Sequence, residues 1–440
     1  MLDPGPVRSR PRQFRAYAIV NGTVLFYVQH LLGIGHARRS FRLAGALGRE
    51  GVEVTLVSGG EPPPGPICAG SARIVQLAPI RARDATFKEL VGPGDQPIDD
   101  ELRKARRETL LATFASARPD AVVIEAFPFG RRAFRFEIEP LIEAARSRSP
   151  RPRIVCSVRD IVVVPDDASR HREIVDRVRA DFDFVLVHGD PAFIRLDASF
   201  SAAAAIADRL IYTGYIGDPA PMDGGDETAE ADEVLVSVGG GAVGGALLST
   251  ALEARRGGCL AGLNWRLLAG PNLPEHTFET LAGVLPEGVV LERYRREFPR
   301  MLRRCHVSVS QAGYNTVLDI LAARARAVVV PFSSERETEQ RLRAERLAAS
   351  GVLELVPEAR LSPVRLGRAI ERAVGREPAP FTVDMDGASR SARLIADLIR
   401  NAEFGAPSGI VSSGLDGLIE DTSPAAERFG NHSRVVRFGR

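Results

Sequence analysis

The chain has 440 residues, of which 45% are hydrophobic and 26% are charged, and its formal net charge is +2. This length exceeds the usual size of a single hydrophobic core, so we expect two domains. The nearly balanced charge gives no reason to expect a nucleic acid partner. Lys88 and Lys104 are the only lysines and neither lies in a GxxxxGK[ST] motif, which excludes a P-loop nucleotide site.

The cysteines and the amino terminus indicate where the protein works. The four cysteines are widely spaced and form no CxxC pair, which predicts neither a disulfide framework nor a zinc site and fits the reducing cytoplasm. Residues 1–20 are expected to be a disordered leader rather than a signal peptide, because Asn21, Gly22 and Thr23 interrupt the apolar stretch that follows. The chain contains no run of about 18 apolar residues that would predict a membrane-spanning helix.

Strands and helices alternate through residues 21–215, a pattern typical of a parallel sheet with crossover helices. We expect strands at 23–29, 52–58, 72–80, 120–126, 153–161 and 184–190, and helices at 37–49, 101–117, 134–147 and 169–180. Residues 216–232 are rich in Gly, Pro and acidic residues and are expected to be a linker.

A second alternating series occupies residues 233–401. We expect strands at 233–238, 265–270, 289–294, 307–311 and 327–332, and helices at 246–256, from 314, through 341–349, around 366–374 and at 392–401. Residues 402–440 lack sustained periodicity and are expected to be a disordered or loosely attached tail. The predicted fold class is α/β, with two Rossmann-like, doubly wound domains.

Each half begins with a strand, a glycine loop and a helix. The loop glycines are Gly33 and Gly35 in the first half, and Gly239, Gly240, Gly241 and Gly244 in the second. Backbone amides at such a helix start suit a phosphate or diphosphate. A dinucleotide oxidoreductase would need an acidic residue at the end of the second strand, and neither half has one. The plainer alternative is that both loops are only tight turns between strand and helix.

A third strand–loop–helix unit begins at His306. Asn315 or Thr316 could cap the helix that starts there, and Asp319 lies one turn further on, where its carboxylate could accept both hydroxyls of a ribose. The alternative for Asp319 is a solvated helix residue.

The segments "AGYNTVLD" and "VPFSSERETEQ" in this region resemble, in order and spacing, the carboxyl-terminal half of glycosyltransferase family 28, the MurG-like enzymes. The loop that ends in His36 resembles the amino-terminal glycine loop of the same family. The similarity covers residues 23–375 and is greater still to uncharacterised bacterial proteins described as glycosyltransferases of this kind. It implies a GT-B fold, in which two Rossmann-like domains face each other across a cleft that holds a nucleotide sugar.

The resemblance also implies roles for residues on the donor side. The diphosphate would be bound by Gly313, by the helix start at Asn315 and Thr316, and by Arg336 or Arg341. The ribose would be bound by Asp319 and the nucleobase by the backbone at Tyr294. The donor sugar would be contacted by Glu339 and Gln340, and other donor oxygens by the glycine loop at Gly239–Gly241. The chain departs from the family at two of these positions, since better-known members have Glu at 319 and Gln at 339.

His36 stands at the start of the first helix, and the GT-B arrangement implied by the resemblance would place it at the cleft. A neutral imidazole there could accept the proton of an acceptor hydroxyl as the hydroxyl attacks the anomeric carbon. The alternative is a histidine that only hydrogen-bonds the loop or orients the acceptor.

Acceptor-side candidates follow strands of the first half. Glu125, Arg159 and Asp160 lie at strand ends, where open α/β sheets bind ligands. Phe127, Phe129, Arg131 and Arg132 could line an acceptor groove or touch a membrane surface. The alternative is that the arginines are solvated and that the apolar residues of this segment, Phe134, Ile138 and Leu141, are helix core.

We therefore predict a glycosyltransferase that moves a sugar, expected to be UDP-linked, to a hydroxyl acceptor that is lipid-linked or a polysaccharide, with cytoplasmic location and peripheral contact with the inner face of the membrane. The family implies an inverting reaction without cofactor or metal. "DFD" at Asp181–Asp183 is not expected to bind a metal, because it precedes a strand in the half that does not hold the donor. The alternatives are a non-hydrolysing sugar-nucleotide epimerase of the same fold and a non-catalytic nucleotide-sugar-binding protein.

Overall fold

The computed structural model describes residues 22–31, 35–62, 69–83, 89–217, 233–240, 243–295, 297–332 and 338–401. The predicted leader 1–20, the predicted tail 402–440 and nearly all of the predicted linker lie outside these residues, as do Gly33, Gly241 and Arg336.

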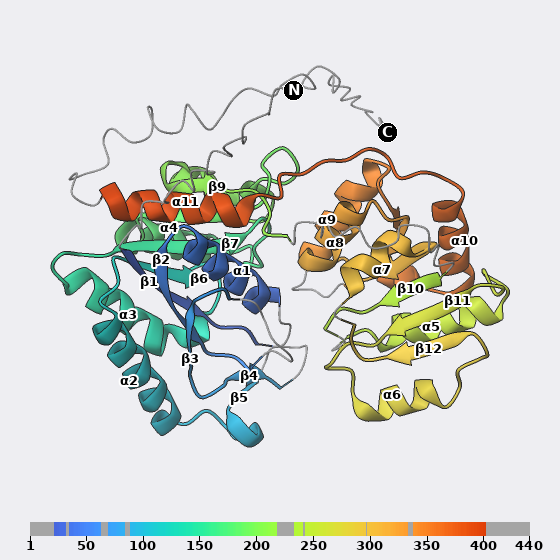
Figure 1. Cartoon of the computed structure of the whole chain (residues 1–440), viewed down its shortest axis with the longest axis horizontal. Coiled ribbons are helices and arrows are strands. Elements are labelled where there is room, and N and C mark those ends of the chain that lie inside the picture. The colour runs from blue at the N-terminus through green and yellow to red at the C-terminus, as the bar shows by residue number, and fades with distance from the viewer. Residues whose placement is uncertain are drawn as a thin grey trace, which may run out of the picture. The chain divides into compact units, whose positions relative to one another are not determined.

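A seven-stranded sheet forms the first half, with the strand order β3-β2-β1-β6-β7-β8-β9 and parallel pairing throughout (Figure 1). Its strands are β1 (Gly22–Val28), β2 (Val52–Ser58), β3 (Arg73–Gln76), β6 (Ala121–Glu125), β7 (Arg153–Arg159), β8 (Phe184–His188) and β9 (Leu210–Tyr212). A separate two-stranded antiparallel ribbon joins β4 (Arg81–Ala82) and β5 (Leu90–Val91).

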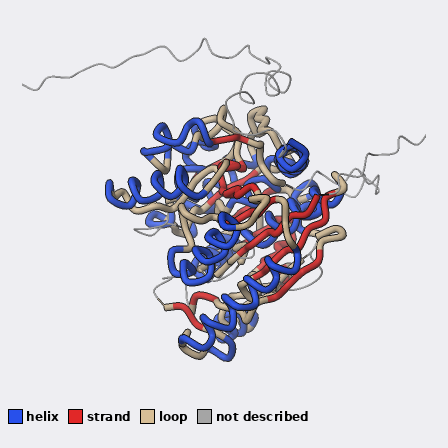
Figure 2. The backbone as a smooth tube through the Cα atoms, turned by 90° about the vertical axis from the view of Figure 1, so that its left-hand side faces the viewer, coloured by secondary structure: helices blue, strands red, loops and turns tan. Residues whose placement is uncertain are grey.

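Both faces of this sheet are buried, because successive side chains of a strand point to opposite faces and those of β1 are nearly all apolar. Leu25 and Tyr27 belong to a core shared with α2 (Asp100–Ala117), α3 (Arg135–Ser147) and α4 (Ala168–Asp181). Val24, Phe26 and Val28 belong to a second core that includes α1 (Gly35–Arg49). Helices therefore cover both faces, and Figure 2 shows the strands lying between helices.

The second half contains a six-stranded parallel sheet with the order β12-β11-β10-β13-β14-β15. Its strands are β10 (Glu233–Ser237), β11 (Asn264–Leu268), β12 (Val289–Glu292), β13 (Val307–Ser310), β14 (Ala327–Val329) and β15 (Glu354–Leu355). Its helices are α5 (Gly245–Arg256), α6 (Glu275–Ala282), α7 (Phe298–Arg304), α8 (Tyr314–Ala323), α9 (Glu339–Ala349) and α10 (Pro363–Val374). The apolar side chains of β10 again divide between two cores, one on each face of the sheet.

The last helix, α11 (Gly387–Arg400), packs on the first sheet and not on the second. Its buried residues Ala392, Ile395 and Ala396 share a core with Val24 and Phe26 of β1. The sequence predicts that residues 233–401 form the second domain, whereas the last helix of that range packs on the first sheet. The sequence shows that α11 has an apolar face but not which sheet covers it.

Short elements were the ones that the sequence did not predict. These are β4, β5, β9, β15, α6, α7 and five short 3₁₀ segments at Pro93–Asp95, Arg132–Phe134, Leu196–Ala198, Ser201–Arg209 and Glu358–Arg360. Most of them have too few residues to show a hydrophobic period. Within the part of the chain that the structure describes, no helix is both long and apolar enough to cross a bilayer.

Candidate active site

The order of the strands places one loop cluster at the carboxyl ends of β1 and β6. The connection after β1 leads through α1 to β2, whereas the connection after β6 leads through α3 to β7 on the opposite side. The two loops diverge and leave a crevice, which is where doubly wound sheets bind ligands. His36 is the second residue of α1 and Glu125 is the last residue of β6, so both lie at this point.

His36 and Glu125 form a hydrogen-bonded pair. The imidazole Nδ1 lies 2.6 Å from Glu125 Oε1, and the carboxylate is fully buried while the imidazole remains 19% exposed. An ionised carboxylate can only accept, so Nδ1 carries the proton and donates it, which leaves the lone pair on Nε2. Arg39, one turn after His36, forms a buried ion pair with the same carboxylate oxygen. Arg39 thereby holds Glu125 in its ionised form.

The protonation states fit a general base. Burial lowers the pKa of His36 to about 3, an effect that the positive charges of Arg131 and Arg159 increase and the Glu125 carboxylate opposes. Burial raises the pKa of Glu125, but its contacts with His36 and the charges of Arg39 and Arg131 outweigh burial and hold that pKa below its usual range. At neutral pH the pair is therefore a neutral imidazole beside a carboxylate.

A pocket of about 80 Å³ opens beside this pair. Its polar lining consists of His36, Glu125, Arg131 and Arg159. Its apolar lining consists of Ala126, Phe129, Val158, Ile161, Val162 and Val163. A volume of this order has room for one end of a larger molecule and is smaller than a pocket that encloses a whole drug-sized ligand. The predicted acceptor-side residues Glu125 and Arg159 thus come together with His36.

In the second sheet the connections after the neighbouring strands β10 and β13 also run to opposite sides. Gly239 follows β10 with a positive φ of 57°, the left-handed region that favours glycine. Gly240 is part of the same turn, and its carbonyl accepts a hydrogen bond from the amide of Asn272. Gly244, the residue before α5, packs so tightly that an added Cβ would lie 2.1 Å from Val238 Cβ. Gly244 therefore serves the packing of helix on strand, whereas Gly239 serves the turn.

Gly313 precedes α8, and none of the described side chains caps this helix start. The expectation that Asn315 or Thr316 caps the helix is therefore wrong; both lie within its first turn, after the cap position. The Asn315 Oδ1 atom is buried and has no hydrogen-bond partner among the described residues. Apart from its chain neighbours, no atom of the described residues lies within 4 Å of a Cβ added at Gly313. Backbone amides at a helix start suit an anionic group.

The starts of α1 and α8 approach each other. A Cβ added at Gly35 would lie 3.0 Å from the side-chain nitrogen Nδ2 of Asn315, and Arg38 donates a hydrogen bond to the Tyr294 hydroxyl over 3.4 Å. Tyr294 is exposed, with 45% of its surface accessible. Residues predicted for the acceptor side and for the donor side thus meet at these two helix starts.

Asp160 is fully buried and bonded through both oxygens, to Arg343 at 2.8 Å and to the Tyr215 hydroxyl at 2.9 Å. The expectation that Asp160 faces an acceptor is corrected by this environment, because neither oxygen is directed to an open space. Asp160 joins β7 to α9 instead.

Glu339 and Gln340 begin α9 and are engaged within the protein. Glu339 is 2% exposed and forms ion pairs with Arg159 and, at 3.0 Å, with Arg343. Gln340 Oε1 accepts hydrogen bonds from the backbone amides of Ala312 and Phe332, both at 3.1 Å. These bonds fix the loops after β13 and β14, so in this structure Glu339 and Gln340 shape the crevice rather than extend into it.

The remaining donor-side residues lie on or near α8. Asp319 is 8% exposed, which differs from a solvated helix residue, and Thr316 is partly buried in the first turn. Arg341 lies on the outer side of α9 with a side chain that is 60% exposed, next to Glu345.

Sequence reasoning missed three residues that hold this region together: Arg39, Tyr314 and Arg343. The Tyr314 hydroxyl donates to the carbonyl of His188 over 3.1 Å and accepts from the amide of Ile216. The guanidinium groups of Arg39 and Arg343 lie over the Tyr314 ring at 5.6 and 5.5 Å from its centre. The spacing of Arg39 one turn after His36 was an available signal, but nothing local marked the other two.

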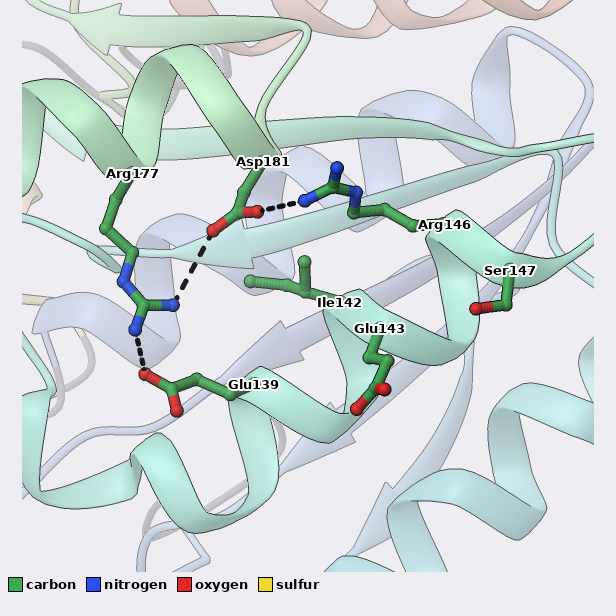
Figure 3. A pocket seen from close by; sticks show the side chains of 7 residues that line it. All are labelled: Glu139, Ile142, Glu143, Arg146, Ser147, Arg177 and Asp181. Atoms are coloured by element: carbon green, nitrogen blue, oxygen red, sulfur yellow. Dashed lines mark hydrogen bonds and ion pairs between the residues drawn. The ribbon is translucent and has the colours of Figure 1, made fainter.

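The "DFD" segment serves the fold. Asp181 bonds Arg146 at 2.8 Å and lies near Arg177 in a surface hollow between α3 and α4 (Figure 3). Asp183 accepts the backbone amide of Ile154 at 2.8 Å. Among the residues that the structure describes, no group of three or more His, Cys, Asp or Glu side chains could hold a metal ion.

Comparison with known proteins identifies the second half. Residues 235–399 match the glycosyltransferase family 28 C-terminal domain. An uncharacterized glycosyltransferase of Methanopyrus kandleri is 29% identical over 169 residues, which are 38% of this chain and 45% of the relative. The UDP-N-acetylglucosamine--N-acetylmuramyl-(pentapeptide) pyrophosphoryl-undecaprenol N-acetylglucosamine transferase of Nitrosococcus oceani is 37% identical over 95 residues, 22% of this chain and 26% of the relative. The chain thus matches less than half the length of each of these relatives.

Solved structures match the whole fold. A calicheamicin glycosyltransferase superposes with a TM-score of 0.53 at 18% identity, covering 87% of this chain and 95% of the other. MurG of Acinetobacter baumannii superposes with a TM-score of 0.50 at 15% identity, covering 86% and 99%. At such identities the likeness shows the fold alone. The chain therefore has the GT-B fold of two Rossmann-like halves, and its residues 235–399 match the glycosyltransferase family 28 C-terminal domain.

Proposed function

We propose that this protein is a metal-independent, inverting glycosyltransferase that moves a sugar from a nucleotide-sugar donor, UDP-linked, to a hydroxyl acceptor. The observation that carries the proposal is the His36–Glu125 pair at the crevice of the first sheet, beside a pocket that one end of an acceptor could enter. The family 28 domain supports a nucleotide-sugar donor on the second sheet.

His36 acts as the general base in this mechanism. Glu125 accepts a hydrogen bond from the protonated Nδ1, so the lone pair of Nε2 is free to take the proton of the acceptor hydroxyl as its oxygen attacks the anomeric carbon from the face opposite the leaving nucleotide. The charge that develops on the imidazolium is balanced by Glu125, whose own pKa is too low for it to take the proton. Positioned proton transfer of this kind contributes about 100- to 10,000-fold in rate.

The diphosphate leaving group is proposed to lie at the start of α8, above Gly313 and near Asn315 and Thr316. The helix dipole and the uncapped amides there stabilise the negative charge that grows as the glycosidic bond breaks. Gly239 and Gly240 approach the donor from the loop after β10, and Asp319 binds the ribose. We further propose that the acceptor is lipid-linked or a polysaccharide and that the protein contacts the inner face of a membrane. The Nitrosococcus oceani relative, which is named for an undecaprenol-linked substrate, supports this extension.

The test combines donor binding with donor cleavage. We expect one class within a panel of UDP-, dTDP- and GDP-linked hexoses to raise the melting temperature of the protein, since saturation about 100-fold above Kd stabilises by about 2.7 kcal/mol. Asp319→Asn should abolish the increase. His36→Gln should keep it but lower the release of nucleotide diphosphate, with water as acceptor, by about 100-fold or more.

The same assay separates the alternatives. An epimerase would change the configuration of the bound sugar without releasing nucleotide diphosphate, and a non-catalytic binding protein would be stabilised by the donor without changing it. Stabilisation by none of the nucleotide sugars would refute the proposed function.

A further inference from the structure

Arg131 enters the pocket beside His36 with a fixed backbone and a fixed side chain. Its φ of 60° lies in the left-handed region, at the turn between β6 and α3. The guanidinium Nε donates to the backbone carbonyl of Gln29, which anchors the side chain from behind. The remaining guanidinium nitrogens make no hydrogen bond to any described residue, and Arg131 lines the pocket.

The charge of Arg131 is not matched by a partner. Arg39 is paired with Glu125, and Arg159 is paired with Glu339. Within the described residues, no carboxylate lies within ion-pair distance of Arg131. Burial lowers the pKa of Arg131, the more distant attraction of Glu125 opposes this effect, and the nearby charges of Arg159 and Arg39 add to it. The pocket therefore has one surplus positive charge in a partly dehydrated position, which is unfavourable until an anion arrives.

Apart from the four polar residues, the pocket wall is mostly apolar. Phe129, Val158 and Ile161 are almost completely buried beneath it, and Val163 at its edge is 40% exposed. A molecule that fills this space would contact hydrocarbon along its length, the Arg131 fork at one point and His36 at another. A guanidinium fork matches the two oxygens of a carboxylate or phosphate better than any neutral group.

We propose that Arg131 anchors an acidic group, a carboxylate or a phosphate monoester, on an acceptor that enters this pocket with an apolar part and places its hydroxyl at His36. The proposal rests on the proposed function, because it takes the pocket as the acceptor site. It adds the chemical class of the acceptor and assigns Arg131 as the residue that selects it.

Three probes of one shape test this proposal without any donor: 3-(4-hydroxyphenyl)propionate, its amide, and 3-(4-hydroxyphenyl)propyl phosphate. We expect titration calorimetry to give a Kd at least about tenfold lower for one or both anions than for the amide, as for a charge-assisted pair. The anion that binds more tightly identifies the acidic group. Arg131→Met should reduce the preference to about threefold or less, and Arg131→Lys should retain part of it.

Arg132→Met is the matched control, because Arg132 is the next residue and its side chain is exposed. This variant should keep the full preference for the anion. If Arg131→Met fails to fold, the comparison of anion and amide in the wild-type protein, and the weakening of that preference by salt, still decide the question.

Three results would overturn the assignment: equal affinity for the amide and the anions, a preference for anions that survives in Arg131→Met, or no binding of any of the three probes at millimolar concentration. These outcomes are distinguishable from failure of the proposed function. Donor stabilisation with equal binding of anion and amide refutes only the role of Arg131, whereas an Arg131-dependent preference for anions without donor binding refutes only the proposed activity.

Discussion

The chemistry at the residue scale depends on how one carboxylate is shared. Glu125 accepts from His36 and Arg39 through the same oxygen, while its other oxygen is buried without a hydrogen-bond partner among the described residues. The imidazole is therefore fixed in one tautomer by a group that cannot easily be protonated. The sequence predicted His36 from its place at the helix start, and Glu125 from its place at a strand end, but not that the two would bond.

The rate of donor cleavage should respond to pH as the His36 environment dictates. The imidazole of His36 can act as a base only when it is unprotonated, so the rate falls as the pH falls through the pKa of His36. Because burial lowers this pKa to about 3, we expect kcat/KM to stay level from pH 8 to about pH 4.5, and not to decline below pH 6.5 as for an ordinary histidine. Measured pH–rate profiles for the wild type and for Glu125→Gln check this.

Glu125→Gln is expected to lower the rate by about 100-fold or more, because the amide neither fixes the tautomer nor balances the imidazolium charge. A wild-type profile with half-maximal rate near pH 6.5 would show that the imidazole is not held in the buried environment seen here.

At the scale of elements, three glycines that look alike in the sequence have different tasks. Gly239 allows a turn, Gly244 allows α5 to pack on Val238, and Gly313 leaves open space at the start of α8. The sequence shows only that each follows a strand and precedes a helix. Which glycine is needed for folding depends on what lies above its Cα, and distant segments decide that.

Gly244→Ala and Gly313→Ala form a matched pair for this difference. Alanine at 244 would place a methyl group 2.1 Å from Val238 Cβ, so we expect a loss of about 1–3 kcal/mol or more in the free energy of unfolding. Alanine at 313 has room and an ordinary φ of −64°, so the change should stay within about 0.5 kcal/mol. Urea unfolding of both variants measures this, and equal losses would contradict the packing described here.

At the scale of the whole molecule, two features link the halves of the fold. Helix α11 follows the second sheet in the chain but shares a core with β1, and Arg343 of α9 bonds Asp160 at the end of β7. The ionic groups of the second feature are buried: Asp160, Arg343 and Glu339 are each 2% exposed or less. Buried carboxylates require their partners, so this network is sensitive to single changes.

Arg343→Met should lower stability by about 3–5 kcal/mol, since it leaves two carboxylates buried without this cation. Adding Asp160→Asn should recover part of the loss, because one of the stranded charges is removed. Arg341→Met on the exposed side of the same helix is the control and should change stability by about 0.5 kcal/mol or less. Thermal unfolding of the variants measures these changes, and a loss in Arg341→Met equal to that in Arg343→Met would rule out the special role of the buried network.

The sequence by itself determined the alternation of strands and helices, the two parallel sheets and the glycine loops at their carboxyl ends. These features follow from local periodicity and from the backbone freedom of glycine, so a short window of residues is enough to reveal them. Only the tertiary structure decided the pairing of His36 with Glu125, the placement of α11 on the first sheet and the burial of Asp160. The partners concerned are 89 residues apart for His36 and Glu125 and 183 apart for Asp160 and Arg343, and contacts over such distances leave no pattern along the chain.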